Sequence, residues 1–320
     1  MRIRFWGTRG SLPVSLTAAE IKHKIVESLL AAAGRTFRTR QDAESFVEKD
    51  LPFSVSHTYG GNSSCVELDV GSGEYILCDL GTGARPFGLH VLAQKKGAAK
   101  PSTFHVFLSH LHWDHIMGFP FLVPAYIPGN RIVIYGCHEA IEQVFRKQHA
   151  APCFPVDFSQ LSAKVEFVRL QPGKRERVAG LEVTPKLQMH GGDSYGYRFE
   201  HGGKVVVYST DSEHRTDDKA STREFVEFFN KADLVIFDAM YSLADTVSVK
   251  EDWGHSSNIV GVELCQLAQA KHLCLFHHEP VHSDAKIASV LEETLRLEQI
   301  TREGHPLKIS SAYDGMEIVV

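Results

Sequence analysis

A cluster of histidine and aspartate residues directly after an apolar run constrains this chain more than any other stretch. The run Phe104–Leu108 has the length and composition of a short buried β-strand, and Gly118 with Pro120 interrupts regular structure soon afterwards. Between them lie four side chains of the kind that bind metals: His110, His112, Asp114 and His115. The sequence therefore predicts a metal-binding loop held at the end of a core strand.

The crowding of these side chains indicates more than one metal ion. A single ion in a relaxed tetrahedron cannot use four ligands from so short a loop, so two ions that share the loop explain the spacing better. The donors are imidazole nitrogens and a carboxylate, with no thiolate, which suits an open catalytic site for zinc, manganese or iron. We expect two divalent ions per chain, with zinc as the first choice. The alternative is a solvated, histidine-rich turn.

Composition narrows the class of protein. The chain has 320 residues, 43% of them hydrophobic, which is long enough for a sizeable core. The formal net charge of -5 argues against long nucleic acid as a partner, and Lys95 with Lys96 is only a brief basic pair. There are 18 histidines, and histidine is the commonest metal ligand.

Cysteine usage and hydropathy predict a cytoplasmic protein with no membrane partner. None of the six cysteines forms a Cys-x-x-Cys pair, and Cys65, Cys78 and Cys274 lie in apolar runs, as buried reduced thiols do. The first residues lack the apolar segment of a signal peptide, and no apolar run reaches the length of a membrane span.

The order of predicted elements indicates an α+β fold in one domain over residues 1–320. Hairpins dominate each half of the chain, with helices interspersed. Two mostly antiparallel sheets packed face to face, with helices outside both, fit this order. A capping box at Thr17 and Glu20 begins a helix that extends to about Ala33, and a second helix is expected over 41–49.

Four polar residues share one position relative to the predicted strands. His110, His190, Asp211 and His277 each follow the C-terminal end of an apolar run. Strand ends from two packed sheets can meet along one edge, where Asp211 could bridge two ions that His190 and His277 complete. Taken singly, His190 can be a turn residue, Asp211 a helix N-cap and His277 an ordinary strand-end histidine.

This succession of ligand residues resembles the metallo-β-lactamase superfamily. The similarity is closer to its phosphodiesterase branch, which includes the tRNA-processing nuclease RNase Z and small cyclic-phosphodiester hydrolases. Gly254-His-Ser-Ser257 resembles a Gly-His-Ser-Thr stretch of RNase Z, and Ser194–Tyr197 resembles its Gly-Tyr hairpin. Phe5–Ser11 and Tyr59–Cys65 resemble bacterial cyclic-nucleotide phosphodiesterase-like hydrolases. A helical insert at about 14–57 falls outside the resemblance; it either covers the cleft or mediates association.

The resemblance implies an αββα sandwich of the α/β (α+β) class with a dinuclear site at one edge. The ligands that it implies are His110, His112 and His190 for one ion, and Asp114, His115 and His277 for the other, with Asp211 bridging both. His278 competes with His277 for its place. Asp79 is expected to support the ligand loop through hydrogen bonds instead of binding a metal.

The resemblance also implies metal-dependent hydrolysis of a phosphodiester by a hydroxide that bridges the two ions. Asp114 and His255 are the expected catalytic residues, with His255 as the general acid for the leaving oxygen. Packing at the start of the next helix is the alternative for His255, because Ser256 and Ser257 can cap that helix themselves. Weaker candidates for substrate contact are Asn62, Ser63, Ser64 and His278.

We expect the substrate to be a small cyclic phosphodiester such as a cyclic nucleotide. Metal ions supply local positive charge, so an acidic protein can bind a small anion of this kind. One alternative is an RNase Z-like RNA-processing nuclease, although the sequence has no basic arm for tRNA. Another is a lactonase or other acyl hydrolase, against which the Gly-His-Ser-Ser stretch argues. The sequence is also compatible with a homodimer.

Overall fold

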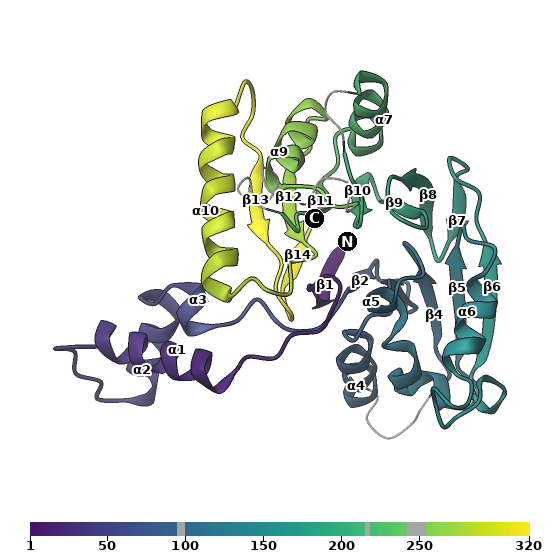
Figure 1. Ribbon diagram of the computed structural model, residues 1–320, viewed down its shortest axis with the longest axis horizontal. Coiled ribbons are helices and arrows are strands. Elements are labelled where there is room, and N and C mark those ends of the chain that lie inside the picture. Colours follow the sequence, from purple (N-terminus) through teal and green to yellow (C-terminus); the bar gives the residue numbers. More distant parts are fainter. Residues whose placement is uncertain (95–99, 215–217, 242–253) are drawn as a thin grey trace.

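The computed structural model describes residues 1–94, 100–214, 218–241 and 254–320, and Lys95 and Lys96 lie outside them. These residues form two seven-stranded sheets. The sheets face one another, with helices on the outer face of each (Figure 1). The predicted αββα sandwich is therefore confirmed. No helix in the described parts of the chain is both long and apolar enough to cross a membrane.

The first sheet has the strand order β14-β1-β2-β3-β4-β5-β6. Its strands are Arg2–Gly7 (β1), Cys65–Asp69 (β2), Tyr75–Cys78 (β3), Thr103–Phe107 (β4), Arg131–Gly136 (β5), Lys164–Arg169 (β6) and Glu317–Val319 (β14). The second sheet has the order β13-β12-β11-β10-β9-β8-β7. Its strands are Glu176–Val178 (β7), Leu181–Gln188 (β8), Ser194–His201 (β9), Lys204–Ser209 (β10), Leu234–Asp238 (β11), His272–Phe276 (β12) and Lys308–Ser311 (β13).

Both sheets are mixed, which corrects the expectation of mostly antiparallel sheets. The neighbours β14, β1, β2 and β3 run antiparallel, whereas β3 to β6 run parallel. In the second sheet β7 to β10 run antiparallel and β10 to β13 run parallel. The parallel strands are joined by helical crossovers, which return the chain to the same end of the sheet before each new strand.

Helices cover the outer face of each sheet. The first sheet carries Ala84–Gln94 (α4), Trp113–Ile116 (α5), Ile141–Gln148 (α6) and the short 3-10 helices Phe119–Phe121 (η1), Val123–Tyr126 (η2) and Phe158–Gln160 (η3). The second carries Lys219–Phe229 (α7), Asn258–Leu267 (α9) and Asp284–Thr301 (α10). Phe87 of α4 and Phe145 of α6 are buried against the first sheet, and Val262 of α9 against the second. The sequence analysis did not anticipate α4.

Aromatic side chains fill the space between the sheets. The Phe107 ring of β4 lies 5.5 Å from the ring of Tyr197 and 5.2 Å from that of Phe199, both on β9. Phe5 of β1 and Phe276 of β12 have ring centroids 6.0 Å apart. These contacts fix the two sheets against each other and thus fix the strand ends that carry the polar residues. All six cysteines are free, and Cys65, Cys78 and Cys274 are buried as predicted.

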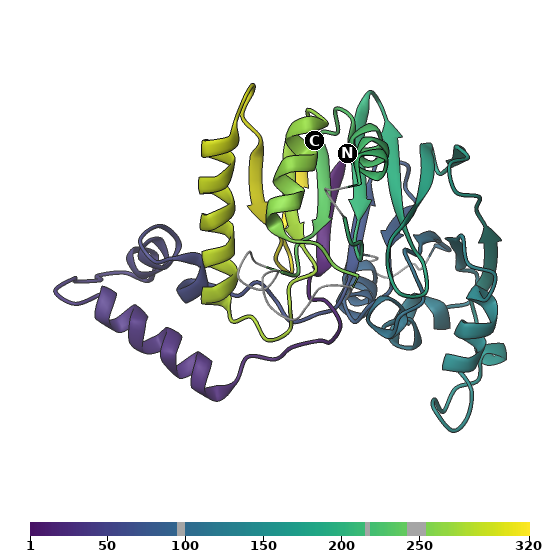
Figure 2. The same cartoon turned by 45° about the horizontal axis from the view of Figure 1, so that its top comes forward.

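The insert forms a helical arm that projects beside the sandwich (Figures 1 and 2). It contains Ala18–Ala31 (α1), Arg40–Lys49 (α2) and Phe53–Ser56 (α3). Thr17 and Glu20 form the predicted capping box at the start of α1, and Thr39 with Asp42 forms another at α2. The two predicted helices are confirmed. No residue of α1 is buried.

Replacing Phe107 by alanine should destabilise the fold strongly. Its ring is fully buried between the sheets, and such truncations cost about 3–5 kcal/mol in the free energy of unfolding. Leu267→Ala is the matched control, because 56% of Leu267 is exposed and its change should stay below about 1 kcal/mol. Urea unfolding followed by circular dichroism measures both, and equal effects would contradict this packing.

Candidate metal centre

Polar residues at the strand ends of both sheets meet along one edge of the sandwich. His110 follows β4 of the first sheet, whereas His190, Asp211 and His277 follow β8, β10 and β12 of the second. Among the described residues, they and their neighbours form four overlapping groups, each with all ligand atoms within 4.8 Å of one another. Two of the four include His255, and the other two do not. The structure thus brings together every residue that the sequence pattern implied as a metal ligand.

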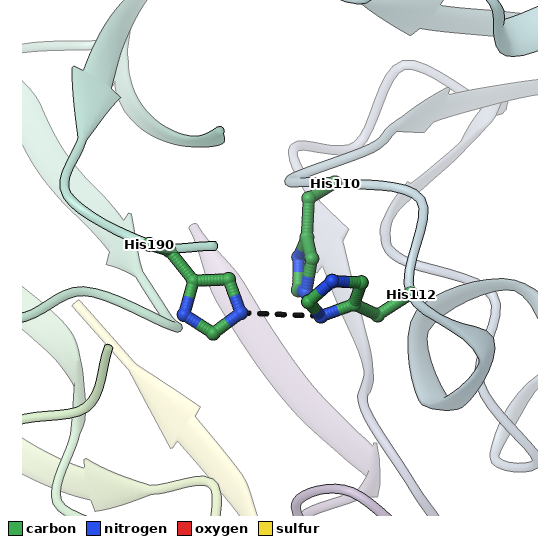
Figure 3. Close-up of side chains that lie close together, drawn as sticks. All are labelled: His110, His112 and His190. Atoms are coloured by element: carbon green, nitrogen blue, oxygen red, sulfur yellow. Dashed lines mark hydrogen bonds between the residues drawn. The ribbon is translucent and has the colours of Figure 1, made fainter. Parts of the chain in front are cut away.

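The first group contains the three histidines His110, His112 and His190 (Figure 3). The Nδ1 atom of His112 lies 3.1 Å from Nε2 of His190. His110 is buried, and its Nε2 atom has no hydrogen-bond partner among the described residues. An unpartnered buried nitrogen that faces two further imidazoles is suited to a cation.

The second group contains Asp114, His115, Asp211 and His277, and all four are buried. Nε2 of His115 lies 3.1 Å from Asp114 Oδ2 and 3.3 Å from Nε2 of His277. Nε2 of His277 is 3.2 Å from the same Asp114 oxygen. Two imidazole nitrogens and a carboxylate oxygen therefore converge on one point.

Asp211 lies between the two groups and presents one oxygen to each. Its Oδ1 atom is 3.2 Å from Nε2 of both His115 and His277. Its Oδ2 atom is 3.5 Å from His110 Nε2 and 3.7 Å from His190 Nε2. This is the arrangement that a carboxylate needs to bridge two cations.

The electrostatics of the cluster fit divalent ions. Burial lowers the pKa of His110 well below its ordinary value, which keeps that imidazole neutral. Burial alone would raise the pKa of Asp114 and of Asp211, but the surrounding histidines outweigh it and both pKa values are lowered. Ionised carboxylates and imidazole nitrogens, without thiolate, are donors for zinc, manganese or iron.

The backbone is strained where these residues leave their strands. Asp79, Asp211 and His277 have φ angles of 61°, 48° and 60°, in the left-handed region that side chains other than glycine rarely adopt. Two glycines make room for the ligands. A Cβ atom on Gly10 would lie 2.5 Å from the His277 ring, and one on Gly254 would lie 2.5 Å from His190 Nδ1. Both glycines belong to the motifs noted in the sequence.

Asp79 supports the ligand loop through hydrogen bonds from its buried carboxylate. Its Oδ2 atom accepts hydrogen bonds from His115 Nδ1, Ser109 Oγ and Tyr208 Oη, each at 2.7 Å. Its Oδ1 atom accepts from the Ser109 backbone N–H at 2.8 Å. The bond to Nδ1 directs the other nitrogen of His115 toward the second group.

The structure separates His277 from His278. His277 belongs to the second group, whereas Nε2 of His278 donates to the carbonyl oxygen of Ala312 at 2.9 Å. Burial lowers the pKa of His278 to about 3, so its imidazole is neutral and serves to join two chain segments. The geometry favours His277 as the ligand.

Two of the residues considered for substrate contact, Asn62 and Ser63, make hydrogen bonds within the loop around the site. Asn62 Nδ2 donates to Asp314 Oδ2 at 3.1 Å, and Ser63 Oγ donates to the carbonyl oxygen of Asp114 at 2.8 Å. Ser63 and Ser64 have no exposed surface. A role of these residues in substrate contact stays a prediction.

Asp238 is a site residue that the sequence analysis missed. It ends β11, is fully buried, and accepts a hydrogen bond from His255 Nδ1 at 2.8 Å. The sequence could have indicated it, because Asp238 follows the apolar run Leu234–Phe237 just as the predicted ligands follow apolar runs. Burial acts to lower the pKa of His255, but the Asp238 carboxylate outweighs it and raises the pKa to about 9.

His255 stands beside both ligand groups. Its ring lies 5.1 Å from that of His190 and 5.2 Å from that of His277. Ser257 caps α9 by accepting a hydrogen bond from the backbone N–H of Val260, so His255 is not needed as the cap. His255 therefore lies between the two ligand groups without serving as the helix cap.

Comparison with known proteins identifies the family. A family model described as the β-lactamase superfamily domain matches residues 74–278. The chain belongs to the β-lactamase superfamily. The matched region contains every proposed ligand of both metal groups, whereas the helical arm precedes it.

Relatives within the superfamily confirm the predicted resemblance to its RNase Z-like branch. Ribonuclease Z of Haloarcula marismortui is 24% identical over 293 residues, which cover 77% of this chain and 87% of that protein. The metallo-β-lactamase fold protein YhfI from Bacillus subtilis has a TM-score of 0.64 at 17% identity, covering 99% of this chain and 98% of its own. A diphosphatase from the PhnP family has a TM-score of 0.59 at 20% identity, and the match covers 100% of this chain and 97% of that protein. The two structural likenesses show the same fold.

As a superfamily member with two ligand groups, the purified protein should carry close to two divalent ions per chain. Asp211→Ala should remove more than one ion's worth of occupancy, because its two oxygens face both groups. His277→Ala should lose metal, whereas His278→Ala, the matched control, should retain it. Elemental analysis of each variant measures the content, and at most one ion in fully loaded wild type would contradict a dinuclear centre.

Proposed function

We propose that this protein hydrolyses a phosphodiester bond in a small cyclic phosphodiester, such as a cyclic nucleotide, with two divalent metal ions. Its superfamily and relatives make it an enzyme of the metallo-β-lactamase hydrolase class. The observation that carries the narrower proposal is the Asp238–His255 pair. In this pair Nδ1 of His255 is hydrogen-bonded to Asp238, and the ring lies beside His190 and His277, where it would supply a proton next to the two proposed ions.

Divalent metal ions held by the two ligand groups would supply the positive charge that phosphodiester cleavage needs. Two divalent ions, when bound, would neutralise the charge that builds up on phosphorus and provide a nucleophile from water at neutral pH. The protein's own contribution is to hold them. Ser11 helps to fix one ligand carboxylate, because its backbone N–H donates to Asp114 Oδ2 at 2.8 Å. Asp114 thus acts in catalysis by orienting the centre.

His255 is proposed to protonate the departing oxygen. Its Nδ1 atom is occupied by Asp238, so Nε2 is the nitrogen that can carry a proton to the substrate. A buried carboxylate behind an imidazole fixes its orientation and favours the protonated form. A competing role as a metal ligand is also geometrically open, because one His255 nitrogen lies within 4.8 Å of ligand atoms of His190 and Asp211. Metal content separates the two roles.

An RNA-processing nuclease is the second candidate. The resemblance to Ribonuclease Z of Haloarcula marismortui favours it. Against it stand the net charge of -5 and the absence from the sequence of a Lys- and Arg-rich arm, because long nucleic acid is bound through many phosphate contacts. A small phosphodiester requires only the local charge of the metal centre.

The bond type can be tested with chromogenic substrates. The metal-loaded protein should cleave bis(p-nitrophenyl) phosphate and should leave a chromogenic β-lactam and a lactone intact. Two metal ions stabilise a transition state most when negative charge accumulates around phosphorus. Lactam or lactone turnover comparable to that of the phosphodiester would refute the assignment. In the same screen, cyclic mononucleotides should be turned over faster than a tRNA precursor, and the reverse order would establish the nuclease.

His255→Ala should lower the rate in a way that depends on the leaving group. General acid catalysis is typically worth about a hundredfold to ten-thousandfold, and a loss of that size is expected on a cyclic nucleotide. A ribose hydroxyl leaves as a strongly basic alkoxide and needs the proton, whereas p-nitrophenolate is a weak base. The loss on bis(p-nitrophenyl) phosphate should therefore be much smaller, and metal content should not change.

The matched control is His201→Ala, since His201 lies at the end of β9, at the far end of the β9–β10 hairpin from Asp211. This variant should keep wild-type rates on both substrates. Equal losses of His255→Ala on the two substrates, with metal retained, would exclude the general-acid role. Loss of an ion from His255→Ala would identify the residue as a ligand.

A further inference from the structure

The first helix of the arm carries an uncovered apolar face. The exposed fractions are 47% for Ile21, 55% for Ile25, 41% for Val26, 67% for Leu29 and 65% for Leu30. Monomeric proteins rarely leave so many large aliphatic side chains together in water. An apolar helical stripe of this kind normally faces a core.

Here the polar edge of α1 faces the body of the protein. Lys24 forms an ion pair with Asp284 Oδ2 of α10 at 2.8 Å and donates to the carbonyl oxygen of His57 at 2.7 Å. With 3.6 residues per turn, Lys24 lies about 140° around the helix from Leu29. The contacts that anchor α1 therefore turn its apolar face outward, away from the sandwich.

We infer that a second copy of this chain covers this face, with the two α1 helices packed antiparallel about a two-fold axis. The apolar positions read the same from both ends of the helix. Ile21 and Leu30 are equally far from the midpoint between Ile25 and Val26. A two-fold interface requires such self-complementarity, because each residue must fit the partner's copy of the same patch.

The remaining position of this symmetrical pattern is occupied by Lys22, which would lie opposite Leu29 of the partner helix. A lysine can extend its methylene stem along an apolar surface and keep its ammonium group in water. The pairing therefore needs no buried charge. It places only aliphatic surface at the centre of the interface.

The five exposed aliphatic side chains of α1 form the centre of the proposed interface on each copy. Stable interfaces bury about 1,200 Å² or more in total, so polar residues around this stripe would supply the rim.

Charge disfavours a membrane surface as the occupant. Helices that lie on membranes carry a strongly basic polar face. In α1 the basic residues Lys22 and Lys24 are balanced by Glu20 and Glu27. The arm also precedes the region that matches the superfamily, so this interface belongs to the arm and is independent of the proposed reaction.

The test is the molar mass of the full chain in solution, measured by light scattering after gel filtration. Wild type should have twice the mass of one chain. The double variant Ile25→Glu, Leu29→Glu should dissociate at least a hundredfold more readily and elute as a monomer. Circular dichroism should be unchanged, because both side chains are already exposed. Glu27→Gln, a substitution outside the stripe on the same helix, is the matched control and should remain a dimer.

A cross-link gives an independent readout. Ile25→Cys should form a disulfide between two chains under mild oxidation, because position 25 lies beside the two-fold axis, whereas His23→Cys should not. Monomeric wild type at micromolar concentration would overturn the inference, and so would a dimer that persists in the double variant. Wild type that stays monomeric yet binds vesicles of anionic phospholipid would likewise overturn it in favour of a membrane surface.

Discussion

The buried carboxylate of Asp79 is the interaction on which the rest of the site depends. It joins the end of β3 in the first sheet, the ligand loop through Ser109 and His115, and the second sheet through Tyr208. Burying a carboxylate is costly unless its oxygens are hydrogen-bonded, and four hydrogen bonds from the protein offset that cost. Asp79 thereby fixes both the spacing of the sheets at this edge and the direction of the His115 imidazole, a proposed metal ligand.

The histidine and aspartate side chains gather at this edge because strands of both sheets end there. Each sheet contributes ligands on short segments that follow rigid strands, so the aromatic packing between the sheets holds the ligands in register. Asp211 then links the two histidine groups through its two oxygens. The left-handed backbone of Asp211 and His277 is strained, and the dense packing around both residues maintains it. The Asp238–His255 pair lies at the same edge, and we propose that it moves a proton.

The sequence indicated which polar residues lie together, partly because residue type, strand ends and spacing are local properties and partly through the family resemblance. The capping box at Thr17 was equally local. Strand direction was not, since it depends on which crossovers contain helices, and α4 escaped notice because Pro86 and Gly88 interrupt its pattern. Asp238 was missed although it ends an apolar run, because no spacing motif marked it. The capping box predicted the helix α1, but it is the ion pair from Lys24 that shows which side of α1 faces the protein.

The central claim is that this edge is a dinuclear centre with a proton donor beside it. A crystal structure of the metal-loaded protein, with anomalous data collected at the absorption edge of the bound metal, tests it most directly. The account predicts two anomalous peaks per chain. One should lie among His110, His112 and His190, and the other among Asp114, His115 and His277, with Asp211 contacting both and His255 contacting neither. A single peak, or a metal bound to the nitrogen of His255, would contradict it.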